Sequence, residues 1–319
     1  MTSSQAPRRG PTEWNSEPKD RTMNDLPDIL ESSDAVQQAT GYVFTEGPLW
    51  HPDDYWYFND IRPGALYKMK LGEEPTLIRK TEGANGMTFD LQGRLIHCEG
   101  EANRVSRTEL DGTVTTLVDR FEGGRFNRPN DVICHSDGSL YFTDPSMRRP
   151  FAEREQPRPE GEDGVWGGAR VYRIAPDDSI KAVVTVEYPN GLALSPDERT
   201  LYIANTRSTK YIHAIDIDAE GNLLDRRIFC DLSGQAPGIP DGMKVDQKGR
   251  VYCTGPGGIW VMEPDGTHIG TIKVPEQSVN FAFGGPDLCT LFVCAVTSVY
   301  TLRVKTPGQP HPFYLTRNS

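Results

Sequence analysis

Six residues with oxygen-bearing side chains recur along the chain, each at the mouth of an apolar run: Glu46, Asn85, Asn130, Asn190, Asp241 and Asn280. Asn and Asp are poor strand formers, so one such residue alone would indicate only a turn cap at the start of a strand. Six equivalent positions favour a shared task. A ring of such oxygens with two formal negative charges suits a divalent cation, and Ca²⁺ accepts both carboxylate and amide oxygens.

Each of these residues opens a repeated unit. The units begin EGPLWHPDDYWYFND, NGMTFDLQGRLIHCE, NDVICHSDGSLYFTD, NGLALSPDERTLYIAN, DGMKVDQKGRVYCTG and NFAFGGPDLCTLFVCA, and they start 39, 45, 60, 51 and 39 residues apart. Alternating apolar residues, a polar turn and a second apolar run indicate a hairpin of half-buried strands. Several strands in each interval of ~40–50 residues are typical of propeller blades. We therefore predict an all-β, six-bladed β-propeller with four-stranded blades and the six polar residues around a central metal-binding channel.

The domain boundaries follow from this repeat. Residues 34–304 are predicted to form the propeller, with residues 1–33 as a flexible N-terminal arm and residues 305–319 as a tail. The sixth unit has room for three strands, so AVQQATGYVF, which precedes Glu46, is expected to supply the fourth and close the ring. The sixth unit matches least well, because Phe281 and Phe283 are out of phase with the other units. Residues 145–169 form an insertion that is either a lid or a solvated loop.

Bulk properties exclude several classes of protein. The 319 residues carry a net charge of −11, which argues against nucleic acid or an anionic membrane as the main partner. The chain has no stretch near the ~18 apolar residues of a membrane helix and no visible secretory signal. Its six cysteines lie in apolar runs without a CxxC pair, which indicates free thiols and a cytoplasmic protein. We expect a monomer or a weak homodimer.

At EGP, RPND, PNG and PDGM, in this order and spacing, the chain resembles the gluconolactonase/regucalcin (senescence marker protein) family of six-bladed propellers. The resemblance covers about residues 40–304 and is strongest to the bacterial gluconolactonase branch. It implies one divalent metal ion held by Glu46, Asn130, Asn190 and Asp241, with Asp241 also the catalytic base or nucleophile. Arg128 matches a substrate-contacting arginine, although the bacterial branch more often has SPND there. Asn205 stands where that branch commonly has Asp.

The resemblance implies a metal-dependent lactonase that opens the ester ring of a sugar lactone. A metal ion polarises the carbonyl and a carboxylate accepts the proton of the attacking water. The ion is expected to be Ca²⁺, with Zn²⁺, Mn²⁺ or Mg²⁺ as alternatives. The hydroxyls of the sugar are expected to pair with the remaining ring amides and with polar residues at the ends of second strands, namely Asn85, Asn280, Asp60, Glu99, Asp144 and Asn205.

Two alternatives stay open at this stage. One is a phosphotriesterase-like hydrolase of the diisopropyl-fluorophosphatase type, which shares the fold and the metal quartet. The other is a propeller that binds metal or ligand without catalysis. The sequence contains no GxSxG, HExxH or P-loop motif, and its six histidines show no metal-ligand spacing.

Overall fold

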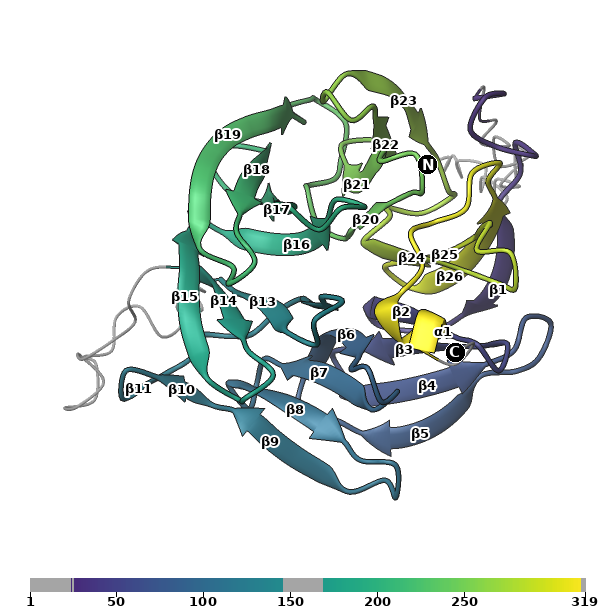
Figure 1. Cartoon of the computed structure of the whole chain (residues 1–319). Coiled ribbons are helices and arrows are strands. Elements are labelled where there is room, and N and C mark those ends of the chain that lie inside the picture. The colour runs from purple at the N-terminus through teal and green to yellow at the C-terminus, as the bar shows by residue number, and fades with distance from the viewer. Residues whose placement is uncertain (1–23, 25, 146–168, 317–319) are drawn as a thin grey trace, which may run out of the picture.

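The computed structural model describes residues 24, 26–145 and 169–316. Six antiparallel four-stranded sheets surround a common centre, as Figure 1 shows. The prediction of a six-bladed propeller with four-stranded blades is confirmed. The predicted insertion at 145–169, apart from its two end residues, and most of the predicted arm lie outside the described residues.

The strands follow the repeat in chain order. Blade one contains β2 (Thr45–His51), β3 (Tyr55–Asp60), β4 (Ala65–Met69) and β5 (Thr76–Lys80). Blade two contains β6 (Ala84–Phe89), β7 (Leu95–Glu99), β8 (Arg104–Thr108) and β9 (Val114–Val118). Blade three contains β12 (Val132–Cys134), β13 (Leu140–Asp144), β14 (Arg170–Ile174) and β15 (Ile180–Thr185). Blade four contains β16 (Pro189–Leu194), β17 (Thr200–Asn205), β18 (Tyr211–Ile217) and β19 (Leu223–Asp231). Blade five contains β20 (Met243–Val245), β21 (Val251–Gly255), β22 (Gly258–Met262) and β23 (His268–Ile272).

The sixth blade closes the ring with both ends of the propeller domain. It contains β24 (Asn280–Gly284), β25 (Thr290–Ala295), β26 (Ser298–Arg303) and, as its outer strand, β1 (Val36–Thr40). β1 pairs antiparallel with β26, with Val36 opposite Thr301 and Thr40 opposite Ser298. The expected closure by an N-terminal strand is therefore present, and it removes an exposed strand edge from the last blade.

The apolar side chains form six clusters, one between each pair of neighbouring blades. Successive residues of a strand point to opposite faces of its sheet. Leu192 accordingly packs in the cluster shared with blade three, and Ala193 packs in the cluster shared with blade five. At the closing interface the rings of Trp56 and Phe292 stack with centroids 4.8 Å apart. The period-two pattern of the inner strands thus places apolar groups on both faces of each blade.

The irregular phase of the sixth unit has a structural cause. In blades one, two and four the register shifts between the ring residue and the strand that follows it, for example between Glu46 and Leu49. This bulge adds a residue and re-aims the strand. In blade six the pairing continues without a shift from Asn280 to Gly284. Because blade six lacks this extra residue, Phe281 and Phe283 are out of phase with the other units in the sequence. They still belong to a regular inner strand.

Glycines after the ring residues let neighbouring blades approach. A Cβ on Gly191 would lie 2.0 Å from the backbone oxygen of Asp241, and one on Gly242 would lie 2.0 Å from Oδ1 of Asn280. No side chain fits at such distances. Each glycine therefore brings one ring position directly against the next.

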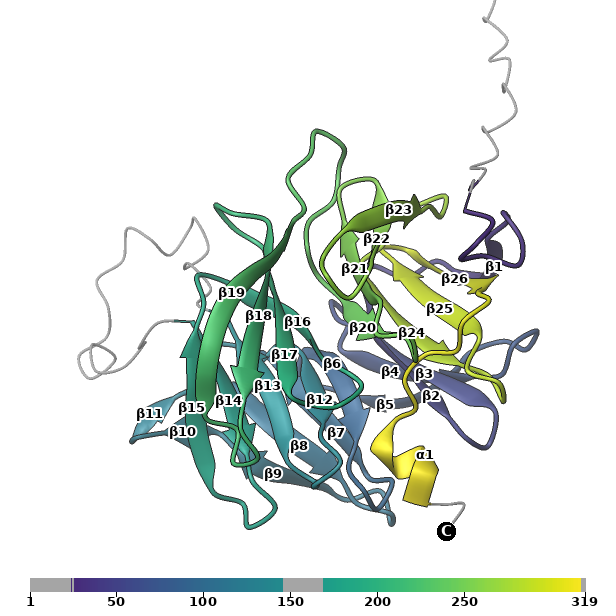
Figure 2. The same cartoon turned by 45° about the horizontal axis from the view of Figure 1, so that its top comes forward.

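Both ends of the described chain pack more closely than predicted. Ile29 and Leu30, assigned to the flexible arm, are buried in the core between the last two blades. Residues 305–316 cross one face of the propeller and end in α1 (Pro312–Thr316), which Figure 2 shows beneath the ring. A short hairpin of β10 (Arg120–Phe121) and β11 (Gly124–Arg125) precedes blade three. No helix among the described residues is long and apolar enough to cross a membrane.

Candidate active site

Five of the six ring residues line one cavity of about 360 Å³. The cavity lies at the end of the channel where the inner strands begin, and it is lined by Glu46, Asn85, Asn130, Asn190 and Asp241 together with residues of the loops that lead into those strands. Asn280 is buried beside Glu46, to which it is hydrogen-bonded. The structure therefore brings the predicted ring together.

Hydrogen bonds connect the amides of the ring. Nδ2 of Asn85 donates to Oδ1 of Asn130 at 2.6 Å, and Nδ2 of Asn130 donates to Oδ1 of Asn190 at 2.8 Å. Nδ2 of Asn190 donates to the hydroxyl of Thr206 at 3.1 Å. An amide oxygen has two lone pairs, so an oxygen that accepts one of these bonds retains capacity for a second partner.

The two carboxylates of the ring differ in their surroundings. Oε2 of Glu46 accepts hydrogen bonds from the backbone N of Gly47 at 2.7 Å and from Nδ2 of Asn280 at 2.8 Å. Asp241 is half-buried and faces the cavity. Burial raises the pKa of Glu46 to about 7. Burial, followed by repulsion from Glu46 and Asp131, raises the pKa of Asp241 well above its ordinary value.

The donor set fits a divalent cation. Two buried carboxylates that repel each other are unfavourable unless a positive charge compensates them. Among the described residues, Oδ1 of Asn85 and Oδ2 of Asp131 are buried and accept no hydrogen bond. The described residues contain no group of three or more His, Cys, Asp or Glu side chains able to hold a metal ion. A cation site here would consist of two carboxylates and amide oxygens, a set that suits Ca²⁺.

Residues at the ends of second strands hold the loops that precede the ring residues. Asp60 accepts the backbone N–H of Phe44 at 2.8 Å, Asp144 accepts that of Arg128 at 2.6 Å, and Asn205 accepts that of Tyr188 at 2.8 Å. Each acceptor thus fixes the backbone two residues before a ring residue. Asp144 and Asn205 are buried and absent from the cavity wall, so the structure does not bring these predicted substrate-binding residues to the cavity.

Glu99 has a different role from the one predicted for it. Its carboxylate lies 2.7 Å from Nη2 of Arg104 and 3.3 Å from Nη1 of Arg79. The pair with Arg104 joins the neighbouring strands β7 and β8, and the pair with Arg79 joins blade two to β5 of blade one. Both pairs lower the pKa of Glu99 against the effect of burial. The structure places this residue in a buried ion-pair network beside the cavity wall, where its oxygens already have partners.

Arg128, expected from the resemblance to contact substrate, does line the cavity. Its side chain lies across Gly100, where an added Cβ would come within 2.7 Å of Cγ of Arg128. Its guanidinium lies 3.6 Å from the carboxylate of Glu101, and both side chains are partly exposed. Gly100 and Asp144 together therefore place Arg128 over the site.

The sequence analysis missed several residues of the site. Arg62, Thr206 and Arg207 line the cavity from loops that follow second strands. Asp131 is buried directly behind Asn130, and its Oδ1 would meet a Cβ on Gly86 at 2.2 Å. The dipeptide Asn130-Asp131 was a signal for this third carboxylate, whereas nothing in the repeat distinguishes the loop arginines from ordinary solvated ones.

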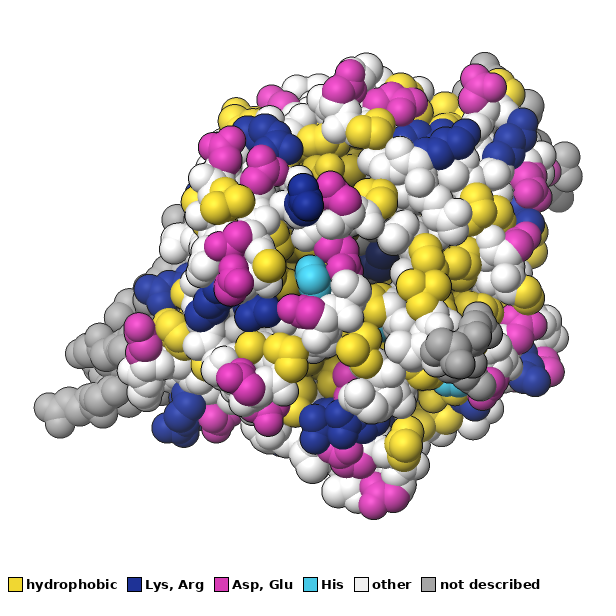
Figure 3. Space-filling view, in the orientation of Figure 1, with side chains coloured by type: hydrophobic (Ala, Val, Ile, Leu, Met, Phe, Trp, Pro, Cys, Tyr) yellow, Lys and Arg dark blue, Asp and Glu magenta, His cyan; other side chains and the backbone are white. Residues whose placement is uncertain are grey.

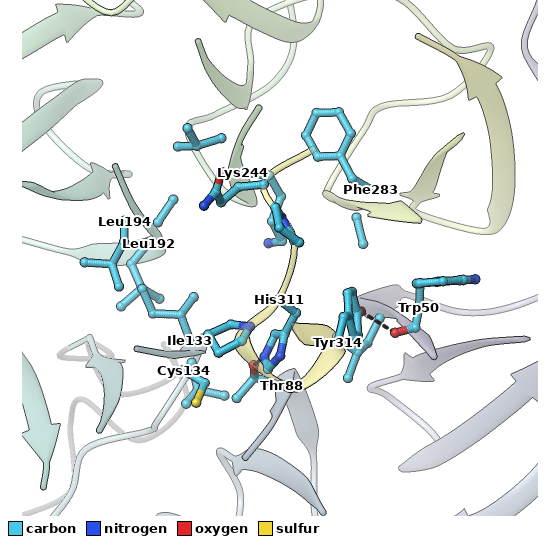
Figure 4. Close-up of a pocket in the computed structure, with 18 of the residues that line it drawn as sticks. Trp50, Thr88, Ile133, Cys134, Leu192, Leu194, Lys244, Phe283, His311 and Tyr314 are labelled. Atoms are coloured by element: carbon cyan, nitrogen blue, oxygen red, sulfur yellow. Dashed lines mark hydrogen bonds between the residues drawn. The ribbon is translucent and has the colours of Figure 1, made fainter. Parts of the chain in front are cut away.

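A second cavity, of about 150 Å³, lies at the opposite end of the inner strands. Figure 3 shows this face, where hydrophobic side chains lie around the centre together with a histidine and a few charged side chains. The C-terminal segment covers part of it: Nε2 of His311 lies 2.8 Å from Oγ1 of Thr88, and the Tyr314 hydroxyl donates to the backbone oxygen of Trp50, as Figure 4 shows. Burial lowers the pKa of His311 to about 3.

Comparison with known proteins agrees with the fold. Residues 44–297 match the SMP-30/Gluconolactonase/LRE-like region. A gluconolactonase from Zymomonas mobilis is 28% identical over 305 residues, which cover 88% of this chain and 84% of that protein. A pentonolactonase from Haloferax volcanii is 33% identical over 263 residues, which cover 78% of this chain and 80% of that protein. The structure of a gluconolactonase from Xanthomonas campestris superposes with a TM-score of 0.77 at 30% identity, covering 91% of this chain and 96% of that one. The resemblance noted in the sequence is confirmed, and the chain belongs to the SMP-30/gluconolactonase/LRE family.

Proposed function

We propose that this protein hydrolyses the ester ring of a sugar lactone with the help of one divalent cation. The observation that carries the proposal is the pair of carboxylates, buried Glu46 and half-buried Asp241, set among amides at the base of an open cavity. The relatives named gluconolactonase and pentonolactonase, which align with most of this chain, support the same reaction class.

The cation would be held by Glu46, Asn130, Asn190 and Asp241, and Ca²⁺ fits this oxygen set best. When bound, it supplies Lewis acidity toward the ester carbonyl and a lower pKa for water. A bound cation would also offset the repulsion between Glu46 and Asp241. Asn85 and Asn280 complete the ring, with Nδ2 of Asn280 fixing Oε2 of Glu46.

Asp241 is the better candidate for the general base. Oε2 of Glu46 is occupied by two donors, whereas Asp241 faces the cavity and keeps part of its surface open. In the reaction, a carboxylate oxygen of Asp241 accepts a proton as water attacks the carbonyl carbon. The ring C–O bond then breaks, the leaving oxygen takes up a proton, and the product is the open-chain hydroxy acid.

The proposal is tested with a panel of aldonolactones, assayed after the protein is stripped of metal and reloaded with Ca²⁺, Mg²⁺, Mn²⁺ or Zn²⁺. We expect ring opening of at least one lactone with one of these ions, measured by acid release. The same preparation is assayed with diisopropyl fluorophosphate. Turnover of the organophosphate alone would replace the lactonase assignment, and no turnover of either would favour a binding protein.

A further inference from the structure

We propose that the substrate is a lactone with a second, anionic group, a carboxylate or a phosphate, remote from the ester ring. This inference rests on the proposed lactonase function and names the class of lactone that the same cavity takes. It is carried by three arginines, Arg62, Arg128 and Arg207, which line the wall of the cavity above the ring.

The three arginines come from three different blades. Arg62 follows β3 of blade one, Arg128 precedes β12 of blade three, and Arg207 follows β17 of blade four. Arg62 and Arg207 are exposed, and Arg128 is half-buried. Because they surround one cavity of about 360 Å³, a single small ligand that reaches the ring can also reach guanidinium groups.

Contacts with the protein orient two of these side chains. The guanidinium carbon of Arg207 lies 4.4 Å from the centroid of the Tyr188 ring, and Asn205 fixes the backbone of Tyr188. Arg128 is placed by Asp144 and Gly100, as described above. A guanidinium that stacks on a ring retains its N–H donors at the edge of its plane. Both arginines are therefore positioned with donors available.

The balance of charge at the cavity is opposite to that of the whole chain. The chain carries a net charge of −11, yet the charged residues lining the cavity are three arginines and the two carboxylates at its base. Glu46 and Asp241 are the proposed ligands of a divalent cation, which compensates their charge. Among the described residues, the salt-bridge partner of the wall arginines is Glu101, beside Arg128. The wall therefore presents positive charge without an equal number of carboxylates.

Guanidinium groups recognise carboxylates and phosphates through paired, charge-assisted hydrogen bonds. A neutral sugar lactone offers only hydroxyls, which amides and uncharged polar groups bind equally well. An aldarate lactone or a phosphosugar lactone has an anionic group at the carbon farthest from the ester. With the ester at the ring, that group lies toward the wall, where the arginines stand.

The experiment compares three lactones on the metal-loaded protein: neutral D-glucono-1,5-lactone, D-glucaro-1,4-lactone with its carboxylate, and 6-phospho-D-glucono-1,5-lactone. We expect kcat/KM for at least one charged lactone to exceed that of the neutral one by about tenfold or more, the worth of one charge-assisted hydrogen bond. The charged lactone that is preferred identifies the anionic group. Arg207→Gln and Arg62→Gln should each remove much of this preference, because each lowers kcat/KM for the charged lactone more than for the neutral one. Arg125→Gln, an exposed arginine outside the cavity wall, is the matched control and should change neither rate.

A binding measurement separates this inference from the proposed function. D-glucitol 6-phosphate and D-glucitol, which contain no ester, are titrated calorimetrically into the wild type, Arg207→Gln and Arg125→Gln. Tighter binding of the phosphorylated polyol that is lost in Arg207→Gln alone supports the inference, even if no lactone is hydrolysed. Hydrolysis of neutral lactones at equal or higher efficiency, with no preference for the phosphorylated polyol, overturns it and leaves the proposed function intact. Preferred phosphate binding that all arginine variants retain also overturns it, because the anion would then bind elsewhere.

Discussion

The two ends of the central channel are built from the same six inner strands and have opposite character. Where the strands begin, Glu46, Asp241 and the ring amides face a polar cavity of about 360 Å³. Toward their other ends, the same strands present groups such as Leu49, Met87 and Phe283 to a smaller cavity that the C-terminal segment partly covers. One strand thus supplies both a polar group for chemistry and apolar groups for packing.

The difference shows how the fold keeps unfavourable groups in place. Buried carboxylates destabilise a protein unless other contacts compensate. Here the polar end is held by hydrogen bonds from neighbouring loops. The opposite end is held by apolar burial and by the C-terminal segment, in which the ring centroid of Phe313 lies 5.2 Å from that of Phe89. We therefore expect substitutions at the polar end to change activity and substitutions at the covered end to change stability.

The largest expected effect is at the polar end. Asp241→Asn retains an oxygen ligand, because Asn130 and Asn190 are already part of the same ring, but an amide does not accept a proton at neutral pH. We expect kcat for lactone hydrolysis to fall by roughly 10²–10⁴, the range for loss of a general base. Steady-state kinetics and metal analysis of the same preparation check this.

The control for that variant is Asn130→Asp, which adds charge at the proposed cation site and leaves Asp241 in place. Its activity should fall less than that of Asp241→Asn, and its metal content should persist. Near-native kcat for Asp241→Asn at saturating metal would show that Asp241 is only a ligand. Glu46 would then become the candidate base.

At the covered end, Phe313→Ala should affect stability and spare catalysis. Phe313 is buried against Phe89, and loss of a buried aromatic side chain costs about 3 kcal/mol of unfolding free energy. Urea denaturation checks this, with Leu315→Ala as the control, since Leu315 is 59% exposed and its loss should change stability by less than about 0.5 kcal/mol. A large drop in kcat with unchanged stability would contradict the separation of the two ends.

The smallest of these effects is a pH dependence at the covered end. Burial lowers the pKa of His311 to about 3, whereas an unfolded histidine titrates near 6.5. Between pH 3 and pH 6.5 the unfolded chain binds a proton at His311 that the folded protein does not bind. The contribution of neutral His311 to the free energy of unfolding is therefore present above about pH 6.5 and is lost as pH falls toward 3. At pH 4.5 the loss is roughly 2–3 kcal/mol. His311→Asn should flatten the fall of stability from pH 7 to 4.5, measured by urea denaturation, while His97, which is also buried and neutral, remains in both proteins. An unchanged pH slope would show that the His311 imidazole is solvated.

The repeat alone was enough to predict the blades, the closing strand and the ring. The alternation of apolar residues can be read within each strand separately. Equivalent positions of a closed repeat must meet at its axis, so the ring follows from the repeat. The roles of Asp144 and Glu99 could not be predicted in this way. Both end second strands near the site, but the direction of each side chain depends on which backbone N–H or arginine lies beside it after folding.

The ends of the chain were harder to predict for a related reason. Residues 26–33 and 305–316 have no repeat and contain several prolines, so their sequences resemble those of free segments. Their burial depends on grooves that the folded propeller supplies, such as the space over Gly93, where an added Cβ would lie 2.5 Å from the Phe313 ring. Arg62 and Arg207 were missed because their proximity to Arg128 arises only when three separate blades come together.

The most direct test of the central claim is calorimetric titration of Ca²⁺ into chelator-treated protein, followed by the lactone assay and circular dichroism on the same sample. We expect one ion bound per chain, no activity before its addition, recovery after it and an unchanged β signature throughout. Glu46→Gln should weaken the binding of Ca²⁺, and Phe313→Ala should not. Full lactonase activity in a sample that metal analysis shows to be free of divalent ions would contradict the account.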